Sequence, residues 1–285
     1  MDVELTEIEI PTPMGHHLAG LLLKTKNIEK HQFIVFGSAT AVKYTFYIQL
    51  ARYFAEHGYS VLLFDYYGIG KSIDKPLRKI KITMAEWGSN DLQSVVNYVQ
   101  NNFEIEEFHY VGHSVGGQVL GMLDNPNVFS KIIFFSAQIG YWRYYKKHNR
   151  SYFLLYYFIF PLLIKIFGYL PSKRLSLGMN LPPNQARQWS RWLLQKNYLF
   201  DDPTIDTTSF QEVTSQILSY SFTDDNWAPL KACQAMVNHY TNAEIIYRDI
   251  NPNDYGLKKI GHFGIFREKN KEKFWGDFIE FLQKT

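Results

Sequence analysis

The segment Gly-His-Ser-Val-Gly over residues 112–116 has the residue types and spacing of a catalytic turn. An apolar run, Phe108–Val111, precedes it as a buried strand would, and an apolar helical period begins at Val119. A sharp strand-to-helix turn lifts a serine hydroxyl above a sheet, and the flanking glycines relieve the crowding. The following helix directs its N-terminal dipole at developing negative charge. We predict that Ser114 is a nucleophile, the alternative being a structural tight turn.

A nucleophilic serine needs a base and a group that orients the base. On a strand-turn-helix scaffold of this kind they follow in the order serine, acid, histidine. Asp224 and Asp225 follow the apolar run Ile217–Tyr220, and His262 lies in a glycine-flanked loop before the last helical segment. We prefer Asp224 as the acid and His262 as the base. Asp225 remains open as the acid, or as a cap for a helix near residue 229.

Strand-like and helix-like segments alternate along the chain and would position these residues. Residues 6–11 and 17–24 indicate an antiparallel pair, and residues 33–36, 61–64, 108–111, 132–135 and 217–220 are short apolar runs typical of buried parallel strands. Helical apolar stripes cover residues 47–55, 87–99 and 274–282, and Thr83 with Glu86 forms a capping box before the second stripe. The pattern predicts an α/β fold: a mostly parallel twisted sheet with helices on both faces.

Composition excludes several classes of protein. The chain has 285 residues, 46% hydrophobic and 20% charged, and its one cysteine, Cys233, excludes an internal disulfide and a cysteine-based zinc site. Both phosphate-loop patterns are incomplete, because Asp65 and Ile73 stand where glycines are required. We therefore expect no metal and no cofactor. The net charge of +3 does not indicate nucleic acid binding, and the acidic N-terminus lacks an apolar signal core, so we expect a cytoplasmic protein.

One block differs in composition from its flanks. Residues 141–200 contain ten Lys or Arg, no Asp or Glu, and sixteen aromatic residues. About eighty residues separate the flanking strand-like runs, far more than a crossover needs. We expect residues 139–207 to form an inserted helical cap on a core made of residues 1–138 and 208–285. Within it, residues 152–164 are apolar and fit a buried cap helix, a helix at a lipid surface or a membrane span.

At these motifs the chain resembles the alpha/beta-hydrolase superfamily, almost from end to end. Residues 65–72, Asp-Tyr-Tyr-Gly-Ile-Gly-Lys-Ser, are similar to its D-x-R-G-x-G-x-S segment, with Tyr67 in place of the usual Arg. Within the superfamily the chain resembles a bacterial "predicted alpha/beta hydrolase" group related to serine-aminopeptidase-like lipases and esterases. The matching segments are residues 140–142, 167–171, 186–192 and 221–225.

From the predicted triad we expect a serine hydrolase that cleaves a carboxylic ester, with thioesters and small amides left open. The resemblance does not identify the substrate. It implies an oxyanion hole formed by the backbone N–H of Val115 and a second donor. The superfamily's His-Gly segment is Phe36-Gly37 here, and we prefer Ala39 as that second donor, with Ser38 and Thr40 as alternatives. Acyl transfer to another acceptor is one alternative function, and a lipid-binding module with a vestigial triad is another. The basic, aromatic cap suggests an anionic amphiphile as substrate and peripheral membrane contact.

Overall fold

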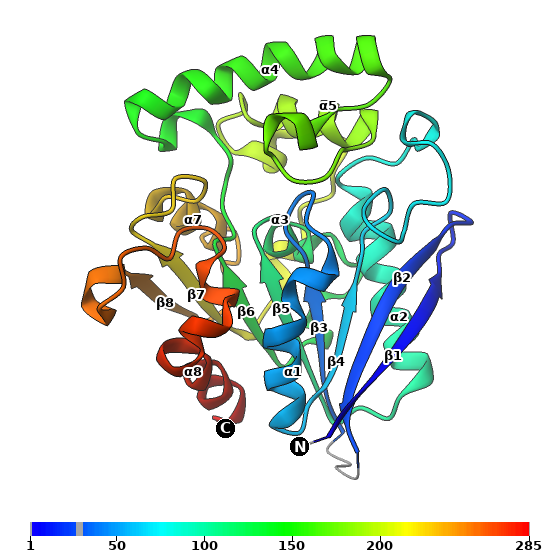
Figure 1. Ribbon diagram of the computed structural model, residues 1–285, viewed down its shortest axis with the longest axis vertical. Coiled ribbons are helices and arrows are strands. Elements are labelled where there is room, and N and C mark those ends of the chain that lie inside the picture. The colour runs from blue at the N-terminus through cyan, green and yellow to red at the C-terminus, as the bar shows by residue number, and fades with distance from the viewer. Residues whose placement is uncertain (1, 27–30, 285) are drawn as a thin grey trace.

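An eight-stranded sheet forms the centre of the protein in the computed structural model, which describes residues 2–26 and 31–284 (Figure 1). The strand order is β1-β2-β4-β3-β5-β6-β7-β8. β1 and β2 are antiparallel to their neighbours, and β4, β3, β5, β6, β7 and β8 are mutually parallel. The bounds are β1 Val3–Pro11, β2 His17–Thr25, β3 Gln32–Gly37, β4 Ser60–Phe64, β5 Glu107–His113, β6 Lys131–Phe135, β7 Gln216–Phe222 and β8 Ile245–Ile250.

The predicted N-terminal hairpin and the five predicted apolar strands are confirmed. The central strands are buried on both faces, which is why they appear in the sequence as continuous apolar runs. β8 was not predicted, because it is an edge strand in which Arg248 and Asp249 are exposed and the preceding residues are half-buried. The α/β fold class is confirmed.

Helices cover both faces of the sheet. The helix bounds are α1 Ile48–Glu56, α2 Gln93–Asn102, α3 Val115–Gln118, α4 Lys147–Phe167, α5 Pro183–Trp192, α6 Ser209–Glu212, α7 Leu230–Val237 and α8 Lys271–Gln283. α1 and α8 lie in front of the sheet in Figure 1 and share one apolar core with it, whereas α2, α3 and α7 pack into the core on the opposite face. This is the layered arrangement that βαβ crossovers produce.

The helix predicted at residues 87–99 has the expected start and an irregular first part. Thr83 N–H and its hydroxyl donate to the Glu86 carboxylate, and Glu86 N–H donates to the Thr83 hydroxyl, so the predicted capping box is formed. A π-helical segment, Trp87–Leu92, then leads into α2. Gly88 lies in this segment where an added Cβ would be 2.6 Å from the carbonyl oxygen of Val119, so α3 and its extension pack directly on it.

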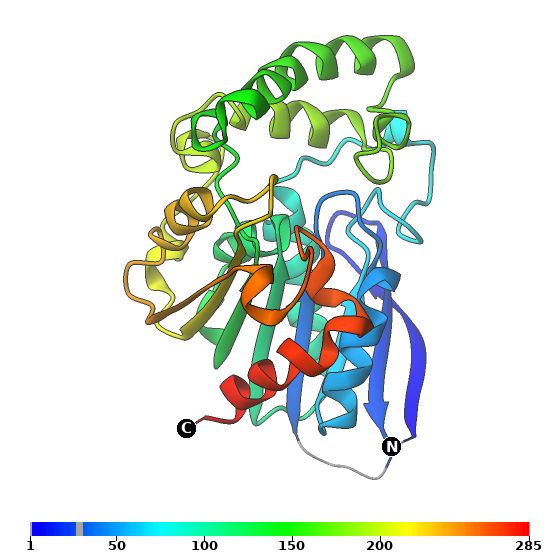
Figure 2. The ribbon, with the colours of Figure 1, turned by 60° about the vertical axis from the view of Figure 1, so that its left-hand side comes forward.

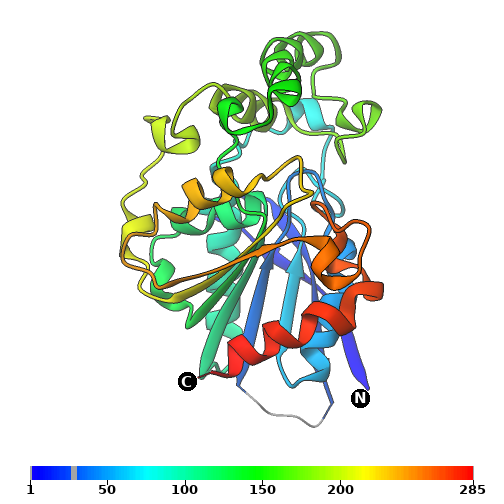
Figure 3. The same cartoon turned by 90° about the vertical axis from the view of Figure 1, so that its left-hand side faces the viewer.

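The chain between β6 and β7 leaves the sheet and returns. It carries α4 and α5, which lie beyond the end of the sheet at which the parallel strands terminate (Figures 1 and 2). Figure 3 shows the same layer from a third side, with α4 farthest from the sheet. Leu170 and Leu181 form an antiparallel bridge that closes the loop between the two helices. The segment thus lies over the edge where the functional side chains of open parallel sheets gather.

Candidate active site

Ser114 lies at the turn between β5 and α3 in a strained backbone conformation. Its φ is 54° and its ψ is −115°, and its N–H donates to the carbonyl oxygen of Phe135 at 2.9 Å. A non-glycine residue holds such a conformation only where the surrounding structure enforces it. A Cβ at Gly116 would lie 2.1 Å from the carbonyl oxygen of Gly37, so the glycine lets α3 approach β3. The predicted strand-turn-helix placement of Ser114 is therefore present in the structure.

His262 is held by a buried carboxylate. Its Nδ1 lies 2.7 Å from Oδ2 of Asp225, whose side chain has no exposed surface. The same Oδ2 accepts from the hydroxyl of Ser136 at 2.8 Å, and Oδ1 accepts from the N–H groups of Trp227 and Ala228. Burial acts to raise the pKa of Asp225, but the His262 imidazole and these hydrogen bonds outweigh burial, so its pKa lies below its ordinary value. Asp225 is thus an ionised anchor for the imidazole.

The preference for Asp224 over Asp225 as the partner of His262 was wrong. The Asp224 carboxylate points into the loop that carries His262, where it accepts from the N–H of Ile260 at 2.9 Å and of Gly261 at 3.0 Å. The turn after β7, in which Asp225 N–H donates to the carbonyl oxygen of Phe222, sends the two adjacent side chains in different directions. Asp224 therefore fixes the loop, and Asp225 fixes the imidazole.

A second set of hydrogen bonds ties the His262 loop to the loop after β3. The Tyr47 hydroxyl accepts from Ala39 N–H at 2.9 Å and lies 2.8 Å from Nδ1 of His113. Nε2 of His113 lies 2.9 Å from the carbonyl oxygen of His262. Burial, and to a lesser extent His262, holds the pKa of His113 well below its ordinary value, so this ring is neutral. A proton on Nε2 satisfies both contacts: the hydroxyl donates to Nδ1, and Nε2–H donates to the His262 carbonyl.

The same contacts bear on the second oxyanion donor, for which Ala39 is the preferred prediction. Ala39 N–H is already used by Tyr47, so it is not free to bind an oxyanion. Thr40, one of the two alternatives, lines the same pocket as Ser114. In the part of the chain that the structure describes, the N–H groups of Val115 and Thr40 donate no hydrogen bond. Both groups are therefore candidate donors to an oxyanion formed at Ser114.

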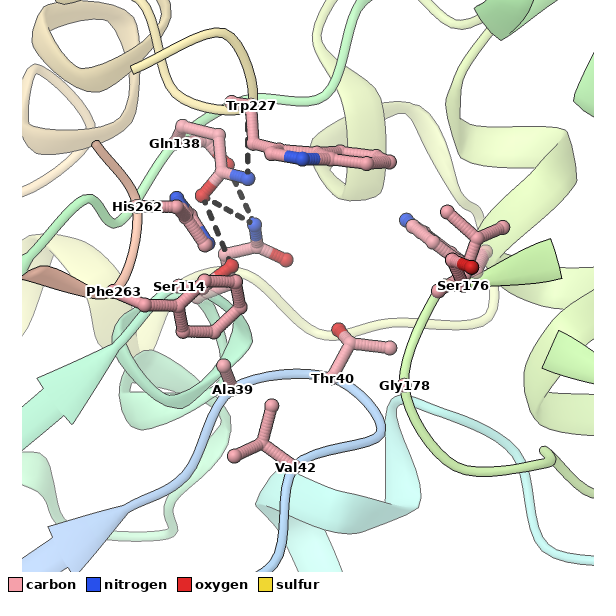
Figure 4. Close-up of a pocket in the computed structure, with 13 residues that line it drawn as sticks. Ala39, Thr40, Val42, Ser114, Gln138, Ser176, Gly178, Trp227, His262 and Phe263 are labelled. Atoms are coloured by element: carbon pink, nitrogen blue, oxygen red, sulfur yellow. Dashed lines mark hydrogen bonds between the residues drawn. The ribbon is translucent and has the colours of Figure 1, made fainter. Parts of the chain in front are cut away.

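One pocket collects these groups (Figure 4). In that view, Ser114, His262 and Gln138 lie on one side and Ser176 and Gly178 on the other. The lining combines both parts of the fold: Ala39, Thr40, Val42, Ser114, Gln118, Gln138, Trp227, His262 and Phe263 come from the sheet side, and Ser176, Leu177, Gly178 and Trp189 come from the segment that carries α4 and α5. The segment between β6 and β7 therefore supplies part of the pocket wall.

The nucleophile and the base line the same pocket. The Ser114 hydroxyl lies 3.5 Å from Oε1 of Gln138, and among the described residues no hydrogen bond links it to His262. Gln118 donates to the carbonyl oxygen of Gln138 at 2.7 Å, which fixes the wall beside Ser114. Over residues 2–26 and 31–284, no group of three or more His, Cys, Asp or Glu could hold a metal ion.

Several residues of the site were not predicted from the sequence. Tyr47 belongs to an apolar helical stripe in the sequence. Nothing in that pattern indicates that its hydroxyl links the loop after β3 to His113 and so to the His262 loop. Gln118 and Gln138 are isolated amides without a motif. Only the position of His113, next to the nucleophile, could have indicated that it belongs to the site.

Comparisons with known proteins agree with this architecture. A family model described as "Serine aminopeptidase, S33" matches residues 29–209. No curated protein matches the chain. Among solved structures, an esterase from Exiguobacterium antarcticum is 16% identical, with 98% of this chain and 100% of that chain covered and a TM-score of 0.63. A Pyrococcus furiosus esterase is 16% identical over 98% and 92% of the two chains, with a TM-score of 0.61.

A third similar structure is Est1E from Butyrivibrio proteoclasticus with ferulic acid bound. It is 16% identical over 96% and 97% of the two chains, with a TM-score of 0.62. At such identities these structures establish the fold, and the family model establishes the family because it spans more than half of the chain. The chain therefore belongs to the serine aminopeptidase family of alpha/beta hydrolases.

Proposed function

We propose that the protein hydrolyses carboxylic esters through an acyl-enzyme formed on Ser114. The observation that carries the proposal is the 2.7 Å contact between His262 Nδ1 and the buried Asp225, in a pocket shared with a serine at a strained strand-to-helix turn. Nδ1 bonded to a carboxylate leaves Nε2 as the basic nitrogen of the ring. The arrangement is suited to deprotonating a serine hydroxyl during attack on a carbonyl.

The reaction would proceed in two halves. Ser114 Oγ attacks the ester carbonyl while His262 Nε2 accepts the hydroxyl proton, and the imidazolium then protonates the departing alcohol. Water, deprotonated by His262, attacks the acyl-enzyme, and Ser114 leaves with the returned proton. Asp225 stabilises the imidazolium in both halves. The N–H groups of Val115 and Thr40 would bind the oxyanion, and loss of one such donor typically costs about 3 kcal/mol of transition-state stabilisation.

The lining favours a small acyl ester with an apolar part. Trp189, Trp227, Leu177 and Phe263 supply apolar surface, while Gln118 and Gln138 supply polar groups near Ser114. Apolar walls with a few placed polar groups are typical of sites that bind small organic ligands. The same chemistry extends to thioesters and small amides. We also propose that basic residues of the inserted segment favour anionic amphiphiles, on the ground that residues 141–200 carry ten basic and no acidic side chains.

Hydrolysis of p-nitrophenyl esters over a range of chain lengths tests the proposed function. We expect turnover by the wild-type protein and its loss, by at least about a thousandfold, in Ser114→Ala. Ser89→Ala is the matched control, because Ser89 is an exposed serine that does not line the pocket. Equal turnover by Ser114→Ala and wild type would contradict the proposal. Adding alcohols or amines and analysing the products separates hydrolysis from acyl transfer.

A further inference from the structure

Helix α4 exposes a continuous apolar stripe. Leu155, Phe158, Leu162 and Ile166 follow one another at spacings of three, four and four residues, which places them on one face of the helix. Their side chains are 47%, 69%, 56% and 62% exposed. α4 is the element farthest from the sheet, with α5 beneath it (Figure 1). The rest of the protein therefore leaves the stripe largely uncovered.

The opposite face of α4 is anchored. Phe153, Phe160 and Ile164 are buried, and the Phe160 ring packs against Trp189 of α5 with ring centres 5.7 Å apart. Among the described residues, α4 is the one helix long and apolar enough to cross a membrane. Only 18% of its most apolar 18-residue stretch is buried inside the protein. Spanning a bilayer would require separating Phe160 and Ile164 from their partners. A position in the plane of a membrane interface keeps them packed while covering the stripe.

The charge around the stripe indicates what covers it. None of the ten Lys and Arg of residues 141–200 forms an ion pair in the part of the chain that the structure describes. Arg187 and Arg191 of α5 line a groove together with Tyr157, Phe158 and Pro161 of α4. Guanidinium groups beside apolar surface suit the phosphate of a lipid whose acyl chains cover the apolar part.

A second copy of the chain is a poorer occupant of the stripe. Pairing two α4 helices face to face would bring together two segments that each carry ten basic and no acidic residues. An anionic bilayer offers the opposite charge and an apolar interior in the same surface. Charge complementarity therefore favours lipid over self-association.

We propose that α4 docks the protein onto anionic lipid bilayers, with its exposed stripe at the level of the acyl chains and Arg187 and Arg191 on headgroup phosphates. Trp189 connects this surface to the pocket, because it contacts Phe160 of α4 and also lines the pocket of Ser114. Docking would place α4, with Phe160 and Trp189 beneath it, between the bilayer and the pocket. The inference goes beyond ester hydrolysis and does not depend on it.

Co-sedimentation of the full chain with vesicles tests the docking. Vesicles of phosphatidylcholine alone are compared with vesicles of phosphatidylcholine and phosphatidylglycerol, at low and high salt. We expect the partition coefficient to be at least about tenfold higher for the anionic vesicles, and to fall when salt is raised. Binding to neither kind of vesicle would overturn the proposal.

Two double variants separate the apolar and electrostatic parts. Phe158→Gln with Leu162→Gln should lower the partition coefficient for both vesicles by at least about tenfold. Arg187→Gln with Arg191→Gln should remove most of the preference for anionic vesicles. Met14→Gln is the control for the apolar variant, because the Met14 side chain is apolar and 52% exposed. Lys258→Gln with Lys269→Gln is the control for the arginine variant, because both lysines are exposed and lie outside the segment between β6 and β7. The controls should bind as wild type does.

Circular dichroism checks that each variant is folded, with a thermal midpoint close to that of wild type. Vesicle binding by Phe158→Gln with Leu162→Gln at the wild-type level would overturn the proposal. Light scattering provides a second check. If the wild type is a dimer, and this variant is a monomer that binds vesicles as the wild type does, the proposal is also overturned. Ser114→Ala should bind vesicles as wild type does, so failure of the docking and failure of the proposed catalysis give different results.

Discussion

At the residue scale, two adjacent carboxylates hold the site together in different ways. Asp225 binds the imidazole of His262, whereas Asp224 binds the backbone of the loop that carries it. The sequence places both at the end of a strand, and only the local turn decides which one reaches the ring. The type of residue and its position were therefore predictable, but the choice between two neighbours was not.

Asparagine variants should separate the two roles. Asp225→Asn keeps the shape but loses the charge that orients and stabilises the imidazolium, so we expect kcat to fall by about a thousandfold or more with little change in KM. Asp224→Asn keeps one acceptor oxygen for the loop and should cost about tenfold or less. Steady-state kinetics with one p-nitrophenyl ester measures both variants. A larger loss in Asp224→Asn than in Asp225→Asn would contradict the assignment.

Tyr47 is predicted to be a positioning residue. Tyr47→Phe removes the acceptor of Ala39 N–H and the donor to His113, so both the loop after β3 and the His262 loop lose a tether. We expect kcat to fall by about tenfold with KM nearly unchanged. Tyr59→Phe is the control, because the Tyr59 hydroxyl is buried without a hydrogen-bond partner among the described residues. Equal kcat values for Tyr47→Phe and Tyr59→Phe would show that the tether is unimportant.

At the element scale, the close approach of β3 and α3 builds the turn at Ser114. Gly116→Ala would place a methyl group 2.1 Å from the carbonyl oxygen of Gly37, a backbone atom that cannot move aside alone. We expect a lower thermal midpoint and a lower kcat. Gly276→Ala in α8 is the control: nothing lies within 4 Å of its added Cβ, and Gly→Ala in a helix stabilises by about 0.5–1 kcal/mol. A midpoint for Gly116→Ala at or above that of wild type would contradict this packing argument.

Sequence periodicity predicts elements well where burial is uniform. β3, β4 and β6 are buried on both faces, and each appears as an unbroken apolar run. β8 is an edge strand with exposed charged residues, so its sequence lacks both the continuous run and a clean alternation. The π-helical start of α2 also carried no sequence signal, because its residues fit an ordinary helical stripe.

At the scale of the whole molecule, the fold buries an acid at the end of β4. Asp65 is 1% exposed, and its carboxylate accepts from the N–H groups of Tyr44 and Lys71. Burial outweighs these bonds and raises the pKa of Asp65 from 3.8 to about 6. Between these values the folded state binds more protons than the unfolded state, so stability from this group falls as pH rises. Over the range between these two pKa values, the free energy of unfolding contributed by Asp65 falls by about 3 kcal/mol.

The free energy of unfolding of wild type and Asp65→Asn, measured by urea denaturation between pH 4 and pH 6.5, checks this prediction. Asparagine cannot ionise. As pH rises, the free energy of unfolding of the wild type should therefore fall relative to that of the variant. The absolute stability of the variant is not the test, because asparagine also loses one acceptor of the native pair. A difference that is constant over this range would contradict the raised pKa.

The composition of the chain singles out one segment of the molecule. The basic, acid-free block of residues 141–200 corresponds to the segment that carries α4 and α5 above the sheet (Figure 2). Composition could not show that Trp189 and Gly178 of this segment would line the same pocket as Ser114. Contacts between segments far apart in sequence depend on packing, which periodicity does not encode.

Covalent labelling with a fluorophosphonate, located by mass spectrometry, tests the central claim most directly. Such a reagent forms a stable phosphonyl ester only with a serine activated by a neighbouring base, and it mimics the charge of the tetrahedral intermediate. We predict one label per chain, on the peptide containing Ser114, and its loss in Ser114→Ala and His262→Ala. A folded protein that takes up no label, or a label on any other serine, would contradict the account.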